Sequence, residues 1–109
     1  MPLFLQQIAY STQAWSALVS KPQNRLEAVR PAIEKLGGKI IGGWIAFGDY
    51  DVVAVADFPD NVSAAAIAMA FAAGGGAREI KTTPLMTFEE ALKAMEKAGK
   101  CGYQPATKG

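Results

Sequence analysis

Residues 40–60, IIGGWIAFGDYDVVAVADFPD, constrain the fold of this chain most, because nearly every position in them is apolar or small. A β-hairpin with one face on a core and the other in water alternates apolar and polar residues. This segment scarcely alternates. The sequence therefore predicts a hairpin whose two faces are both covered.

The pair Gly48-Asp49 at the centre of this segment predicts a two-residue turn, in which Gly48 takes a positive φ and Phe47 pairs with Tyr50. With that register, the core face carries Ile41, Gly43, Ile45, Phe47, Tyr50, Val52, Ala54, Ala56 and Phe58. The second face carries Ile40, Gly42, Trp44, Ala46, Asp51, Val53, Val55 and Asp57. A turn with an odd number of residues would exchange the faces of one strand relative to the other. The second face mixes apolar side chains with one large aromatic and two carboxylates, a composition that suits neither water nor a tight core.

The other elements follow from caps, breakers and periodicity. Strands are predicted at 3–10, 39–47, 50–58 and 77–83. Helices are predicted from Ser11 or Thr12 to Leu18, from Pro22 to Leu36 with a kink at Pro31, from a cap at Asp60 or Asn61 to Ala73, and from the capping box at Thr87 to Ala98. The order βαββαβ with an extra C-terminal helix predicts an α+β, ferredoxin-like fold with an antiparallel four-stranded sheet and helices on one face. One domain is expected over residues 1–98, with a flexible tail at 99–109.

Composition excludes several functions. The 109 residues contain 11 basic and 10 acidic side chains, a formal net charge of +1 that predicts neither nucleic acid nor a membrane surface as a partner. No apolar run approaches the roughly 20 residues of a membrane-spanning helix, and we expect a soluble, cytoplasmic protein. There is no histidine, and Cys101 is the only cysteine. Zinc, haem and histidine-based nucleophilic catalysis lack their usual residues, so no metal and no cofactor are predicted.

A second copy of the same sheet is the simplest cover for the second hairpin face in so short a chain. The sequence thus predicts a homodimer or a higher even oligomer, with two sheets facing each other around a barrel-like interior.

Two segments of the sequence carry a resemblance to a known family. The stretch GGKIIGGWIAFGDYDVVAVADFPDN, together with GGGAREIKTTPLMTFEEAL, resembles the GYD domain family, whose Gly-x-Tyr-Asp pattern is met here by Gly48, Tyr50 and Asp51. The similarity runs from about Leu3 to Ala98. It implies a ferredoxin-like, dimeric α/β-barrel fold and brings no established catalytic residues.

Six residues are candidates for lining a pocket: Trp44, Asp51, Asp57, Gln6, Tyr10 and Lys81. Trp44 suits either the wall of a ligand cavity or the filling of a dimer interface. Asp57 suits either a desolvated base or, more commonly, a solvated carboxylate at a strand end. The Gly-Asp-Tyr-Asp run is more often turn chemistry than catalysis, and the glycines at 74–76 are interpreted as a helix stop.

Two function classes remain. The favoured one is a small-molecule-binding or regulatory module that holds a small apolar ligand inside the barrel. The alternative is a cofactor-independent enzyme, monooxygenase-like or isomerase-like, by analogy of fold alone. An assembly protein with a filled interface is a third interpretation. Whether the interior is void or packed distinguishes them.

Overall fold

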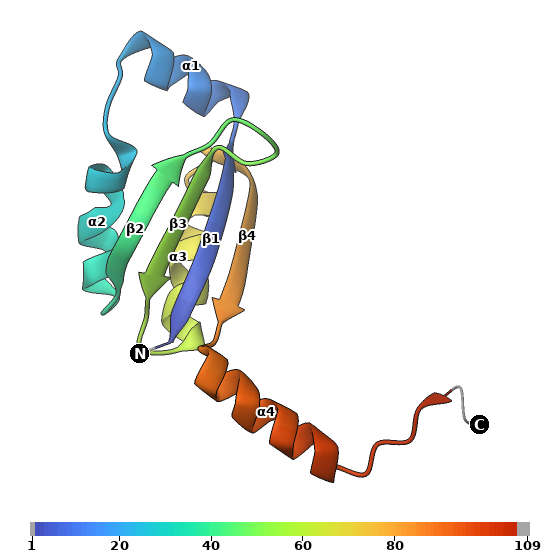
Figure 1. The fold of residues 1–109 in the computed structure, drawn as a ribbon. Coiled ribbons are helices and arrows are strands. Elements are labelled where there is room, and N and C mark those ends of the chain that lie inside the picture. Colours follow the sequence, from blue (N-terminus) through green and yellow to red (C-terminus); the bar gives the residue numbers. More distant parts are fainter. Residues whose placement is uncertain (1, 107–109) are drawn as a thin grey trace.

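The computed structural model describes residues 2–106, which form one antiparallel sheet, two helices that cover one of its faces, and two further helices. The elements are β1 (Leu3–Tyr10), α1 (Thr12–Ser20), α2 (Arg25–Lys35), β2 (Lys39–Ile45), β3 (Val52–Asp57), α3 (Asn61–Ala73), β4 (Ala77–Leu85) and α4 (Phe88–Lys100). The strand order is β2-β3-β1-β4, and every neighbouring pair is antiparallel. Figure 1 shows α3 behind the sheet, α2 beside the edge strand β2, α1 beyond the upper end of the sheet, and α4 projecting from the lower end of β4. The prediction of an α+β, ferredoxin-like fold is confirmed.

Each helix begins at a side chain that accepts a hydrogen bond from the free backbone N–H groups of the first turn. Ser11 accepts from the Ala14 N–H at 3.1 Å, and Asp60 accepts from the Ser63 N–H at 2.8 Å. At α4 the predicted capping box is present, because Thr87 and Glu90 each accept from the backbone N–H of the other.

Several predicted helix boundaries differ from the structure. The first helix continues past Leu18 to Ser20, and the second ends at Lys35, one residue before Leu36. The second helix begins after Asn24 rather than at Pro22, because the Asn24 side chain accepts from the Glu27 N–H and caps it there. Pro31 lies inside this helix. The last helix continues past Ala98 to Lys100; residues 107–109 of the predicted tail lie outside the described residues.

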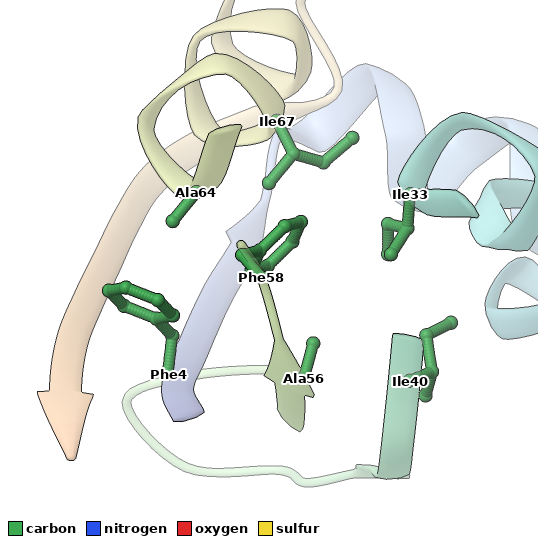
Figure 2. Close-up of a cluster of buried hydrophobic side chains, with 7 residues drawn as sticks. All are labelled: Phe4, Ile33, Ile40, Ala56, Phe58, Ala64 and Ile67. Atoms are coloured by element: carbon green, nitrogen blue, oxygen red, sulfur yellow. The ribbon is translucent and has the colours of Figure 1, made fainter. Parts of the chain in front are cut away.

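The hydrophobic core lies between the sheet and the two helices α2 and α3 (Figure 2). The Phe4 and Phe58 rings meet edge to face with centroids 5.9 Å apart. Ile33 from α2 and Ile67 from α3 close over them, and both are buried. One face of the sheet is thus covered by helices of the same chain.

A β-bulge in β2 corrects the predicted faces of the hairpin. Gly42 pairs with Val55, whereas Ile40 pairs with Ala56, so Ile41 is an extra residue without its own partner. The prediction placed Ile40 on the second face and Ile41 in the core. In the structure Ile40 is buried in the core and Ile41 is exposed.

The connection between β2 and β3 is a six-residue loop, 46–51, and the predicted two-residue turn is wrong. Gly48 does not take a positive φ, and Phe47, predicted in the core, is 98% exposed. The cause is Asp51. Its N–H donates to the Ile8 carbonyl of β1 and its carboxylate accepts from the Tyr10 N–H, both at 2.8 Å. These bonds draw the loop across β1, and the Tyr50 hydroxyl lies 3.5 Å from the Glu79 carboxylate of β4.

The other face of the sheet, which we call the open face, has no helix over it (Figure 1). The pairing places its side chains in cross-strand rows. The rows are Lys39, Asp57, Leu3 and Leu85; then Gly42, Val55, Leu5 and Thr83; then Trp44, Val53, Gln7 and Lys81. Its central Val and Leu side chains are only half-buried.

Candidate functional site

A concavity lies on the helix side of the sheet, lined by residues of α1, the start of α2 and the strands. This feature, which we call the α1–α2 cleft, has a volume of about 710 Å³. Its walls are mainly apolar, with Leu18, Leu26 and Val29 from the helices and Ile8 and Val52 from the strands. A volume of this size and an apolar lining are typical of small-molecule sites.

The α1–α2 cleft also contains aromatic and polar groups. The rings of Tyr10 and Trp15 meet edge to face, with centroids 5.2 Å apart and an interplanar angle of 86°. Arg25 is the one charged side chain among the lining residues, and its Nη1 donates to the Gln23 Oε1 at 3.1 Å. An apolar cleft with a single cationic group suits an apolar ligand that carries an anionic end.

Among the residues that line the cleft, Tyr10 has a shifted pKa. Desolvation raises the pKa of its phenol above the usual value, and the carboxylate of Asp51 adds to this effect. The Arg25 guanidinium opposes the rise, because a cation beside the hydroxyl favours the ionised form. The phenol therefore stays protonated at neutral pH and is a hydrogen-bond donor rather than a base.

Two of the six sequence-predicted residues border the cleft. Tyr10 lies on its wall, and Trp44 lies at its rim on the edge strand β2. The indole of Trp44 covers Gly42 on the open face, where a Cβ at residue 42 would come within 2.8 Å of the ring. Trp44 is 64% exposed. The sequence-based prediction placed it inside an enclosed barrel, an arrangement that needs a second chain.

The other four predicted residues do not meet at one site. Asp51 holds the loop to β1 and caps the Tyr10 N–H. Asp57 and Lys81 lie in different rows of the open face. Gln6 is buried against the helices, on the face opposite to Asp57. Both Gln6 Nε2 and Asp57 Oδ1 are buried without a hydrogen-bond partner in residues 2–106.

Sequence reasoning missed Trp15 and Arg25 as site residues. Trp15 and Leu18 fall on one face of a short helix at i and i+3, a spacing that indicates an apolar surface but not what it covers. Arg25 gave no signal, because a lone arginine at a helix start is ordinary. Its place at the cleft depends on where α2 begins, and that boundary was predicted at Pro22.

Within residues 2–106, no helix is both long and apolar enough to cross a membrane. The same residues hold no group of three His, Cys, Asp or Glu side chains placed to bind a metal ion.

Comparison with known proteins identifies the family. The fold and its cleft define an α+β, ferredoxin-like protein with a small-molecule-sized concavity on the helix side. The GYD domain family matches residues 4–95, which is most of the chain, and the protein belongs to this family. No curated protein and no solved structure matches it.

Proposed function

We propose that this GYD-domain protein binds a small, largely apolar molecule with an anionic end in the α1–α2 cleft. The observation that carries the proposal is the pairing of an apolar cleft of about 710 Å³ with Arg25 as its one charged lining side chain. Apolar walls supply most of the affinity of such sites, and a few polar groups fix the orientation of the ligand.

The position of each polar group suits this ligand. Arg25 lies in the first turn of α2, whose N-terminus adds positive partial charge to the guanidinium. The Tyr10 phenol supplies a donor a short distance away, because its raised pKa keeps the proton in place. The carboxylate of such a ligand would accept hydrogen bonds from both groups, while the apolar part of the ligand packs against Trp15.

Binding is favoured over the enzymatic alternative by the absence of a base. The lining residues include no Asp, Glu or Lys, and Tyr10 is held in its protonated form. A cofactor-independent enzyme that abstracts a proton needs a group with a pKa near the operating pH. Turnover by this cleft would therefore contradict the proposal.

The first test is native mass spectrometry of the purified protein to find a bound small molecule. The second is titration with aryl and alkyl carboxylates, each paired with its neutral amide. Tryptophan emission is followed in a Trp44→Phe variant, so that Trp15 supplies the signal. Carboxylates should bind and quench saturably, whereas the matched amides should bind more weakly. Equal binding of both series would exclude Arg25 as an anchor.

The substitution Arg25→Gln removes the charge from the cleft. Loss of a charge-assisted hydrogen bond costs about 2 kcal/mol, so carboxylate affinity should fall roughly 30-fold. The matched control is Arg30→Gln on the same helix, because Arg30 pairs with Glu27 and does not line the cleft. A second variant, Ala70→Trp, should block the cleft sterically, and Ala73→Trp one turn away should not.

We also propose that the open face of the sheet is covered by a second copy of the chain, giving a homodimer. Val53, Val55 and Leu5 lie side by side across β3 and β1 with no helix over them. Asp57 also lies on this face, in the row that contains Lys39, Leu3 and Leu85. Sedimentation at micromolar concentration tests this proposal.

A further inference from the structure

Helix α4 carries an apolar stripe that its own chain leaves uncovered. Phe88, Leu92 and Met95 recur at i, i+4 and i+7, and the charged residues of the helix lie on the opposite side. Phe88 is 93% exposed and Met95 is 65% exposed, and α4 has no buried residue. Figure 1 shows the helix projecting away from the sheet. A capped helix with such a stripe requires an apolar partner to be stable in this position.

A second uncovered apolar surface lies between α3 and the edge strand β4, which we call the α3–β4 groove. It measures about 650 Å³. Its α3 wall is formed by residues at i, i+3, i+4 and i+7, namely Ala65, Ala68, Met69 and Ala72. Ile80 and Pro84 of β4 form the other wall. Small alanine side chains let the backbone of another helix approach closely. The helix α3 is apolar all round, a composition typical of a helix covered on every side.

We propose that α4 of one chain lies in the α3–β4 groove of a second copy, and that the exchange is reciprocal about a two-fold axis. The two helices match in length, because α3 and α4 have 13 residues each. Only Met86 and Thr87 separate β4 from α4, and Thr87 serves as the helix cap. A hinge this short hinders α4 from folding back onto its own groove and favours exchange between copies.

Charge complementarity supports the same arrangement. Arg78 of β4 lines the groove together with Glu79, its only ion-pair partner within residues 2–106 at a long 3.9 Å, and the Glu79 carboxylate also lies 3.5 Å from the Tyr50 hydroxyl. On α4, Glu89 and Glu96 are seven residues apart and so lie on one flank of the apolar stripe. An acidic flank beside an arginine at the groove rim would fix the direction of the docked helix. This interface is separate from the α1–α2 cleft and from the open face.

Disulfide trapping between two distinguishable chains tests the proposal. Both chains carry Cys101→Ser; one has Met69→Cys in the groove, and the other has Met95→Cys on the stripe and an affinity tag that changes its mass. Mild oxidation of the mixture should give a disulfide-linked mixed dimer, because a disulfide requires Cα atoms within about 7 Å of each other. Replacing Met95→Cys by Lys93→Cys, on the polar side of α4, should abolish the mixed product.

Two results would overturn the proposal. In a chain that carries both Met69→Cys and Met95→Cys, a monomeric oxidation product would show that α4 folds back onto its own groove. Trapping of Met95→Cys with Val53→Cys, in place of Met69→Cys, would show that α4 docks on the open face. Circular dichroism of each variant before oxidation confirms that the helices are intact.

Discussion

Both faces of the sheet carry apolar side chains, yet only one is covered by helices of the chain. On the helix side, Phe4, Ala56 and Phe58 are buried beneath α2 and α3. On the open face, Val53 and Val55 are only half-buried, although they belong to β3, the strand that also carries the buried Ala56. The pattern of residues 40–60 predicts that both faces are covered, and the structure shows helices over one of them. The sequence pattern does not specify whether the residues that cover a face belong to the same molecule. The free energy of burial depends on the apolar area removed from water and not on which chain covers it.

The largest expected effect is a difference between the two faces in how much one side chain contributes to the free energy of unfolding. Phe58→Ala should lower the free energy of unfolding by about 4 kcal/mol, because it empties a fully buried site between two helices. The matched change on the open face, Val55→Ala, should cost much less in the monomer, since Val55 already contacts solvent. Urea denaturation at a concentration where the chain is monomeric compares the two. Equal losses would contradict the difference between the faces.

A charge on the open face tests whether a second copy covers it. Val55→Asp should weaken dimer formation by about 3 kcal/mol, because an unpaired charge would be buried between the two sheets. The folded monomer should persist, since Val55 lies outside the helix-side core. The control is Lys81→Asp, which lies at the exposed margin of the same face and should change association less. An unchanged sedimentation coefficient for Val55→Asp would exclude this face as the interface.

Much of the fold could be predicted because its signals are local. Helix caps at Ser11, Asp60 and Thr87 are short-range hydrogen bonds, and a residue type at the right spacing specifies them. The boundary at Asn24 was missed because Pro22 is an equally good helix start by propensity. In β1, strand alternation puts Gln6 and Tyr10 on the face of Phe4, and the structure shows that this face is turned to the helices and not to the open side of the sheet.

The loop and the bulge could not be predicted, because their causes lie far away in sequence. The Asp51 carboxylate accepts a hydrogen bond from the Tyr10 N–H of β1, 41 positions earlier in the sequence, and this bond is not compatible with the predicted two-residue turn. The bulge at Ile41 reverses the face of Ile40, and a one-residue shift of register is invisible in a segment that is apolar on both faces. The α1–α2 cleft depends on how two short helices stand off the sheet, and no local pattern specifies that. For the same reason, Arg25 emerged only from the structure.

The smallest expected effect concerns Tyr10 on the helix side. Its folded pKa is raised above the unfolded value of about 10, so the protonated phenol favours the folded state. That contribution is fully present below pH 10 and is lost as the pH rises through the folded pKa. Stability should therefore decline in this alkaline range, and Tyr10→Phe should remove part of the decline. Denaturation curves between pH 9 and pH 11 measure the difference.

Two further variants distinguish the causes that shift the pKa of Tyr10. Arg25→Gln removes the cation that opposes the rise, so the pKa of Tyr10 should increase further. Ala70→Trp fills the α1–α2 cleft and displaces water from the phenol, so it should also increase the pKa, whereas Ala73→Trp should not. Tyrosinate absorbance during an alkaline titration reports each change. Because desolvation is the largest cause of the shift, an unaltered titration in Ala70→Trp would mean that the cleft does not control the environment of Tyr10. The helix side would then offer a ligand no desolvated donor, and Arg25 alone would have to hold its anionic end.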